Sequence, residues 1–271
     1  MSRSVGLAHI VRQDDGTSVG IWGTYQLHSA FQPIFAFGSG KLAVAAFEGL
    51  VRPFRDGKPV SPGQFFNGVP AADRFHVETL TRTLHLLNAG ACLDPQVMVF
   101  VNFDPSLFSE NEIIDKALRA HGFKIAVDDY GAEDSDIRRI EELRPDVVKF
   151  DAQWITHLME SGPGFALLST MVSQFAGRGI STVFEGIEEG WQLDLAERSG
   201  ASMVQGYVLA RPELAPTSFA VFRSGRSEGA AMAAGEPSAH AGEASDGHGP
   251  SAARPKPHPA RAFGRRRTFE S

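Results

Sequence analysis

The chain has 271 residues, 42% of them hydrophobic, a length that suits one large core because β/α barrels commonly run to about 250 residues as a single domain. The net charge of −6 at pH 7 gives the folded part no basic footprint for nucleic acid, and the single cysteine, Cys92, excludes an intramolecular disulfide and a cysteine-built zinc site. No apolar run reaches the about 18 residues of a membrane helix, so we expect no membrane segment and a cytoplasmic location.

Residues 1–24 are expected to form an N-terminal extension, and the first strong pattern after it is a β-hairpin. Two apolar runs, residues 31–37 and 42–51, flank the turn Gly38-Ser39-Gly40. Glu48 lies inside the second run, where an unpaired charge is costly, so we expect a cation or a hydrogen-bond donor as its partner. An ion pair with an arginine is the structural alternative.

A helix, a strand and a second helix follow. Apolar residues recur at helical spacing over residues 75–87, and residues 97–103 predict a strand that ends near Asn102. An amide carbonyl is a ligand for hard metal ions, although asparagine at a strand end also forms turns. Ser109 is expected to cap a second helix, which Gly122 closes.

The central stretch, residues 124–151, reads as a strand, a helix and a second strand. The first strand ends in the adjacent carboxylates Asp128 and Asp129, and the second ends in Lys149 and Asp151. Because the carboxyl ends of parallel strands share one rim of a sheet, we expect these charges to converge. Adjacent carboxylates repel unless a cation lies between them, and a divalent ion is the usual partner. Capping of the next helix is the alternative.

Helices and strands continue to alternate up to about residue 209. We expect helices over residues 165–175 and 191–198, and strands over residues 180–184 and 203–209. This alternation predicts an α/β fold, most simply a TIM-type barrel with its chemistry at the carboxyl ends of the strands. The polar residues expected at that mouth are Glu48, Asn102, Asp128, Asp129, Lys149, Glu185 and Gln205.

The chain changes composition at about Ser224, and residues 224–271 are rich in Ala, Gly, Ser and Pro. Such a segment has too few large apolar residues to offset the entropy of ordering, so we expect a disordered tail. Its end is basic, with six Lys or Arg residues between Arg254 and Arg267. This end either contacts an acidic partner or is a solvated run of charge.

Several short motifs occur in order along the chain. They are Phe47-Glu48-Gly49-Leu50-Val51-Arg52, Asn102, Asp128-Asp129-Tyr130-Gly131, Lys149-Phe150-Asp151, Glu185-Gly186-Ile187-Glu188 and Gln205-Gly206-Tyr207. In this order, over roughly Tyr25 to Pro212, the chain resembles the EAL family of cyclic di-GMP phosphodiesterases. The resemblance implies a modified TIM-type barrel with one antiparallel strand, here residues 25–223. It also implies hydrolysis of cyclic di-GMP to the linear dinucleotide in bacterial second-messenger signalling, with two Mg²⁺ or Mn²⁺ ions.

The resemblance implies a role for each matching residue. The metal ligands would be Glu48, Asn102, Asp128, Asp129 and Glu185. The catalytic residues would be Asp129, Glu185 and Lys149, of which Lys149 would help to hold the attacking water. The residues that contact the substrate or support its site would be Gln32, Leu50, Arg52, Asp151, Glu188 and Gln205. A homodimer is a further expectation.

The chain also departs from the family pattern. Family members carry a further helix and a Glu-bearing strand between the Asn strand and the Asp-Asp strand, but only one helix is predicted between Asn102 and Asp128, so the barrel is expected to be about one βα unit short. The loop after Gly131 reads Ala132-Glu133-Asp134 in place of Thr-Gly-Tyr. Gly49 replaces the alanine of the leading motif, a change that removes only a methyl group.

Three functions compete at this stage. The first is a metal-dependent cyclic di-GMP phosphodiesterase, with activity that the missing unit would weaken. The second is a non-catalytic relative that binds cyclic di-GMP or a protein partner, because loss of one ligand can abolish chemistry and leave a pocket. The third is a metal-dependent barrel enzyme in which Lys149 acts as the base for proton abstraction; Arg52, which suits phosphate, argues against it.

Overall fold

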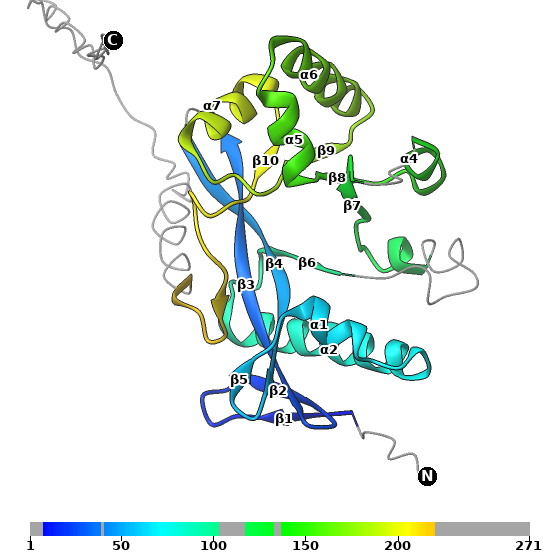
Figure 1. Cartoon of the computed structure of the whole chain (residues 1–271), viewed down its shortest axis with the longest axis vertical. Helices are drawn as coiled ribbons and strands as arrows, with labels where there is room; N and C mark the ends of the chain where they lie inside the picture. Colours follow the sequence, from blue (N-terminus) through cyan, green and yellow to red (C-terminus); the bar gives the residue numbers. More distant parts are fainter. Residues whose placement is uncertain (1–7, 39–40, 103–116, 133–136, 220–271) are drawn as a thin grey trace, which may run out of the picture. The chain divides into compact units, whose positions relative to one another are not determined.

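The computed structural model describes residues 8–38, 41–102, 117–132 and 137–219 (Figure 1). The chain divides into two units, residues 1–229 and 230–271, and every described residue belongs to the first. The tail predicted from Ser224, the cap at Ser109 and the loop residues Glu133 and Asp134 lie outside the described residues. None of the described helices combines the length and the hydropathy needed to cross a bilayer.

Eight elements form the first part of the unit. They are β1 (His9–Arg12), β2 (Ser18–Trp22), β3 (Tyr25–Gly38), β4 (Lys41–Arg55), β5 (Lys58–Pro59), α1 (Pro62–Asn67), α2 (Ala71–Cys92) and β6 (Met98–Val101). The second part contains β7 (Ala126–Tyr130), α4 (Ile137–Leu143), β8 (Val147–Phe150), α5 (Ala152–Met159), α6 (Gly162–Gly177), β9 (Ser181–Phe184), α7 (Gly190–Ser199), β10 (Met203–Val204) and β11 (Glu213–Leu214).

The described strands belong to one mixed sheet. β7, β8, β9 and β10 pair in parallel, in that order, and β10 pairs antiparallel with β3. β3 also pairs antiparallel with β4 along its whole length, and β4 pairs in parallel with β6. Among β3, β4, β6 and β7 to β10, β3 is thus the strand that runs antiparallel to its neighbours, as predicted, and β1, β2, β5 and β11 add further antiparallel pairs.

The sheet is open between β6 and β7. Each of these strands is paired on one side only, and within the described ranges no strand joins them. Residues 117–120 are helical and lead into β7, while residues 103–116 lie outside the described part. The described strands therefore leave β6 and β7 unjoined, and the missing βα unit stays a prediction because residues 103–116 lie outside the described part.

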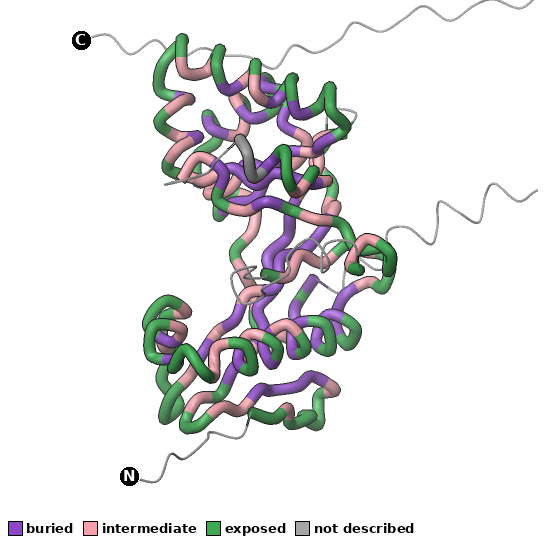
Figure 2. Tube along the Cα trace, turned by 90° about the vertical axis from the view of Figure 1, so that its right-hand side faces the viewer, coloured by how far each residue is buried: buried purple, intermediate pink, exposed green. Residues whose placement is uncertain are grey.

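An apolar cluster packs against each of the two parts of the sheet. β8 is buried at all four positions, and its Phe150 packs with Phe175 and Phe184 in the core beneath α5, α6 and α7. The second cluster contains Leu27 of β3, Val77 and Leu84, and it lies between the strands and the buried side of α2 (Figure 2). A parallel strand that is buried on both faces has room for a charge only at its end, and this places Lys149 at the rim.

Most predicted elements are present, with different lengths. The hairpin of β3 and β4 and the helix α2 are longer than their apolar cores indicated, and α5 and the short α1 were not predicted. The predicted strand over residues 203–209 was too long, because β10 ends at Val204. A Cβ atom on Gly206 would lie 2.0 Å from the carbonyl oxygen of Ile187, so the chain turns there against the neighbouring backbone.

Candidate functional site

A bulge in β7 directs two adjacent carboxylates to one place. Val127 pairs with Val148 and Tyr130 pairs with Phe150, so Asp128 and Asp129 together face the single residue between those partners. Asp129 has φ = 54°, a left-handed conformation that aspartate tolerates better than most residues. Side chains of a regular strand alternate between faces, and the extra residue removes this alternation. The bulge thus frees both carboxylates for the site.

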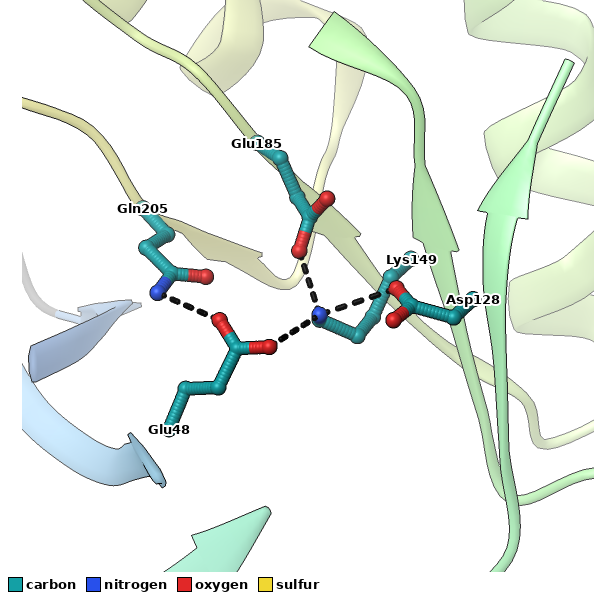
Figure 3. A network of polar contacts seen from close by, with 5 residues as sticks. All are labelled: Glu48, Asp128, Lys149, Glu185 and Gln205. Atoms are coloured by element: carbon teal, nitrogen blue, oxygen red, sulfur yellow. Dashed lines mark hydrogen bonds and ion pairs between the residues drawn. The ribbon is translucent and has the colours of Figure 1, made fainter. Parts of the chain in front are cut away.

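The Lys149 ammonium lies at the centre of a buried ion network (Figure 3). Its Nζ is 3.1 Å from Oε1 of Glu48, 2.9 Å from Oδ1 of Asp128 and 2.5 Å from Oε1 of Glu185. The Lys149 side chain is only 3% exposed. These residues come from β4, β7, β8 and the end of β9, so the ammonium ties together strands on both sides of β3 and β10.

Gln205 completes the network from the end of β10. Its Nε2 donates a 2.9 Å hydrogen bond to Oε2 of Glu48, so both carboxylate oxygens of Glu48 are engaged (Figure 3). Its Oε1 is a buried acceptor without a hydrogen-bond partner in the described part of the chain. A buried acceptor of this kind is costly unless a ligand, water or ion meets it, so Gln205 points to a bound group beside Glu48.

Three carboxylates converge as metal ligands would. One ligand oxygen from each of Asp128, Asp129 and Glu185 lies within 4.8 Å of the others. Carboxylate oxygens are the ligands that Mg²⁺, Mn²⁺ and Ca²⁺ prefer, so this set fits a hard divalent ion. Adjacent aspartates predicted this arrangement from the sequence, and Glu185 joins them from β9 as expected.

Burial and mutual repulsion alter the acidity of these groups. Burial raises the pKa of Glu185 to about 7; the Asp128 and Glu48 carboxylates add to this, and Lys149 opposes it. Burial also raises the pKa of Asp129, with a further contribution from Asp128. For Lys149, burial alone lowers the pKa, but the carboxylates of Glu48, Glu185 and Asp128 outweigh it and hold the pKa above its ordinary value. Lys149 is therefore a permanent cation at neutral pH.

A cavity of about 290 Å³ adjoins the network. Its lining includes six of the predicted site residues, and the full set is Gln32, Glu48, Leu50, Ala152, Glu185, Gly186, Glu188, Gln205, Gly206 and Tyr207. Gln32 donates from Nε2 to the carbonyl oxygen of Ala210 at 3.1 Å, which fixes its amide in the wall. A space large enough for part of a nucleotide therefore lies beside the acidic network.

Comparisons with known proteins show which family the chain is similar to. Residues 111–212 match the family model described as EAL domain. This part of the chain is therefore similar to an EAL domain. The uncharacterized EAL-domain containing protein YkuI of Bacillus subtilis is 37% identical over 95 residues, which are 35% of this chain and 23% of YkuI. Cyclic di-GMP phosphodiesterase RocR of Pseudomonas aeruginosa is 34% identical over 95 residues, 35% of this chain and 24% of RocR. The chain thus aligns with about a quarter of the length of these curated relatives.

Solved structures of EAL proteins share this fold. The YkuI structure in complex with c-di-GMP and calcium has a TM-score of 0.56 and 25% sequence identity, and the match covers 69% of this chain and 55% of that one. A calcium and cyclic di-GMP complex of Klebsiella pneumoniae BlrP1 has a TM-score of 0.61 at 22% identity, and covers 79% and 60%. The fold of this chain is therefore shared with proteins whose structures contain cyclic di-GMP and calcium.

Three residues that the motifs predicted make no hydrogen bond or ion pair with the acidic network among the described residues. Asp151 caps α5, because its Oδ1 accepts a 2.8 Å hydrogen bond from the Trp154 amide. Arg52 bonds to the carbonyl oxygen of Val51 and is not part of the cavity lining. Asn102 follows β6 directly and is exposed, without a hydrogen bond to the carboxylates among the described residues. Their substrate and metal roles stay predictions.

Two features of the site were missed or underestimated from the sequence. Tyr207 lines the cavity, 47% exposed, with the Arg211 guanidinium 4.3 Å from its ring centroid. The motif contained this tyrosine, and an aromatic residue beside a polar cavity is the signal that indicates a binding role. Gly49 is also required for close packing, because a Cβ atom there would lie 3.1 Å from Cβ and Cγ of His85. The buried His85 ring occupies the space that an alanine would need.

Proposed function

We propose that this EAL domain hydrolyses cyclic di-GMP to the linear dinucleotide with the help of a divalent ion, Mg²⁺ or Mn²⁺, in the cytoplasm. The observation that carries the proposal is the convergence of Asp128, Asp129 and Glu185 beside a cavity that contains the unpartnered acceptor of Gln205. A metal-ligand set and a pocket in contact with each other are the two parts that phosphodiester hydrolysis needs.

The relatives support the substrate class. RocR is named a cyclic di-GMP phosphodiesterase, and the structures of YkuI and BlrP1 contain the same dinucleotide with calcium. Four residues of the network, Glu48, Lys149, Glu185 and Gln205, belong to the sequence motifs that carry the resemblance to the EAL family.

The chain's own residues would orient the reaction. Asp128, Asp129 and Glu185 would hold the ion, which when bound would polarise the phosphodiester and lower the pKa of water. The Lys149 ammonium, held by three carboxylates, would donate a hydrogen bond to a water or phosphate oxygen that displaces one of them. Glu188 and Tyr207 would contact the part of the nucleotide that lies in the cavity.

The same geometry argues against the proton-abstraction reaction that the sequence left open. A general base must be neutral before it accepts a proton, and the three carboxylates around Lys149 hold its pKa above the ordinary range. Lys149 therefore serves as a positive charge in the proposed reaction.

A receptor without catalysis is the second candidate function. The observation in its favour is that Asn102, the predicted ligand that follows β6, is exposed and has no hydrogen bond to the carboxylates among the described residues. Binding of the dinucleotide without hydrolysis would then be the activity of the domain.

One pair of assays separates the two functions. Calorimetry with cyclic di-GMP and Ca²⁺ measures binding, and chromatography of the reaction with Mn²⁺ detects the linear dinucleotide. The proposed function predicts binding in the first assay and product in the second, with the product lost when a chelator removes the ion. Binding without product would establish the receptor, and absence of both at high micromolar ligand would remove both functions.

Two partner proposals accompany the function. A homodimer and a contact between the basic end, residues 254–267, and an acidic partner follow from the family resemblance and the charge run, respectively. Light scattering of the full chain and of residues 1–223 tests the first. Loss of partner capture when these residues are deleted tests the second.

A further inference from the structure

We propose that His28 of β3 is a further substrate-binding residue, which donates a hydrogen bond to the half of the dinucleotide that lies away from Asp128, Asp129 and Glu185. The proposal deepens the proposed function and rests on it, because it concerns how the same substrate is held. None of the motifs that carry the family resemblance contains His28.

His28 lies on the face of the β3–β4 hairpin that borders the cavity. In the regular register of these strands, His28 pairs with Arg52, and Gln32 pairs with Glu48 four residues further along. Side chains alternate between the two faces of a strand, so residues two or four apart share a face. Gln32, Glu48 and Leu50 line the cavity. His28 and Arg52 therefore continue the same wall beyond Leu50.

Contacts on the two faces of the hairpin agree with this placement. The His28 ring packs edge-on against Phe54, two residues beyond Arg52 on β4, with 5.0 Å between the ring centroids. The next residue of β3 points the other way, because Oγ of Ser29 is 2.8 Å from Nδ1 of His85 in α2. His28 thus faces away from α2, on the cavity side of the sheet.

The ring nitrogens of His28 are available to a ligand. The residue is half-buried, and among the described residues neither nitrogen takes part in a hydrogen bond or an ion pair. Burial lowers the pKa of His28, so at neutral pH the ring is uncharged and has one N–H donor. The contact with Phe54 restrains the ring and leaves this donor unused, which suits an acceptor on a bound molecule.

The two ends of this wall differ in charge. Glu48 belongs to the acidic network, whereas Arg52 lies four residues along β4, about 13 Å away, and forms no ion pair within the described part of the chain. A guanidinium beside an N–H donor suits the phosphate and base acceptors of a nucleotide. The cavity of about 290 Å³ holds only part of a nucleotide, so the uncleaved half of the substrate would lie against Arg52 and His28.

The affinity for cyclic di-GMP in the presence of Ca²⁺, measured by calorimetry on the full chain, tests this placement. His28→Leu keeps an apolar contact with Phe54 and removes the donor, so the dissociation constant should rise about 3–10-fold, the usual effect of one hydrogen bond. His28→Gln keeps an N–H donor and should stay within about 2-fold of the wild type. His76→Leu is the matched control, because His76 also packs edge-on against a phenylalanine but is exposed on α2.

Steady-state kinetics with Mn²⁺ separate substrate binding from a structural effect. A contact with the uncleaved half is made equally in the ground state and the transition state, so His28→Leu should raise KM by a similar factor and leave kcat nearly unchanged. A disturbed hairpin would instead displace Glu48 and lower kcat. If the chain binds the dinucleotide without turnover, the calorimetric affinities decide alone.

Equal affinity of the wild type and His28→Leu would overturn the proposal, as would equal losses in His28→Leu and His28→Gln with a lower kcat in both. Absence of binding by the wild type would overturn the proposed function itself, so the two failures are distinguishable. If a thermal unfolding scan shows that His28→Leu does not fold, His28→Ala takes its place with the same expected rise in the dissociation constant.

Discussion

At the residue scale, Gly49 of the motif that contains Glu48 packs against the buried side chain of His85. The His85 ring is 4% exposed, and its Nδ1 is 2.8 Å from Oγ of Ser29, so the ring has little room to move. A Cβ atom on residue 49 would lie 3.1 Å from two carbons of His85. The glycine next to Glu48 therefore allows the histidine to pack directly against β4.

Gly49→Ala should lower the free energy of unfolding by about 1–3 kcal/mol, the usual cost of overpacking a buried contact. Urea denaturation measures this change. A double-mutant cycle with His85→Ala provides the control, because the alanine at residue 49 should cost less once the ring is absent. An equal cost in both backgrounds would show that the two side chains do not compete for the same space.

His85 should also make stability depend on pH. Burial lowers its pKa to about 4, against 6.5 in the unfolded chain, so between these values the unfolded state binds more protons. The free energy of unfolding should therefore fall as pH falls from 6.5 to 4, by up to about 3 kcal/mol. Glu185 acts in the opposite direction between pH 4.5 and 7, because its pKa is raised on folding.

Comparison with His85→Gln separates these two contributions. The variant lacks the titrating ring and keeps a polar group for Ser29, so the difference in unfolding free energy between wild type and variant should shrink as the pH is lowered from 6.5 to 4. A difference that is constant over this range would contradict the assigned protonation of His85.

At the element scale, Asp151 is a helix cap as well as a motif residue. Its Oδ1 bonds to the Trp154 amide at the start of α5. Asp151→Ala should lower the free energy of unfolding by about 1 kcal/mol, while Asp151→Asn should have little effect, because asparagine caps as well as aspartate. Unfolding and turnover measured together test the cap. If Asp151→Asn abolished turnover and left stability unchanged, the residue would act on the substrate, as the family resemblance implied.

The sequence predicted those helices and strands that the spacing of their apolar residues is enough to identify. The apolar runs of β8 and β9, and the spacing of α6, follow from burial on one or both faces. The bulge at Asp128 and Asp129 could not be predicted, because it depends on the register in which the residues of β7 pair with those of β8. The short α5 was missed because its 8 residues give only about two turns over which the helical spacing can be recognised. The end of β10 depends on the close approach of Gly206 to Ile187.

The same distinction holds for the site. Charges at the ends of parallel strands predicted that Asp128, Lys149 and Glu185 would meet, because topology places those ends together. The choice of partners was not predictable, since the engagement of both Glu48 oxygens by Lys149 and Gln205 is a matter of distances between side chains.

At the scale of the whole molecule, the composition predicts that the C-terminal tail contributes little to stability. Residues 224–271 contain few large apolar side chains that a core could bury. Deletion of these residues should leave the thermal unfolding midpoint within about 1 °C of that of the full chain, since surface changes away from a core are usually close to neutral. A large drop in the midpoint, measured by calorimetry on both chains, would show that the tail docks on the domain.

The central claim is that a metal site built around Asp128 hydrolyses a dinucleotide. Asp128→Asn keeps the size of the side chain and removes the charge that would hold the ion, and Asp194→Asn makes the same change on the exposed surface of α7. The decisive measurement is the rate at which linear dinucleotide forms from cyclic di-GMP with Mn²⁺ in these two variants and in the wild type. We expect wild-type turnover in Asp194→Asn and a loss of at least about 100-fold in Asp128→Asn, as for other removals of a charge that stabilises the transition state. Equal turnover in all three proteins would contradict the metal-site assignment.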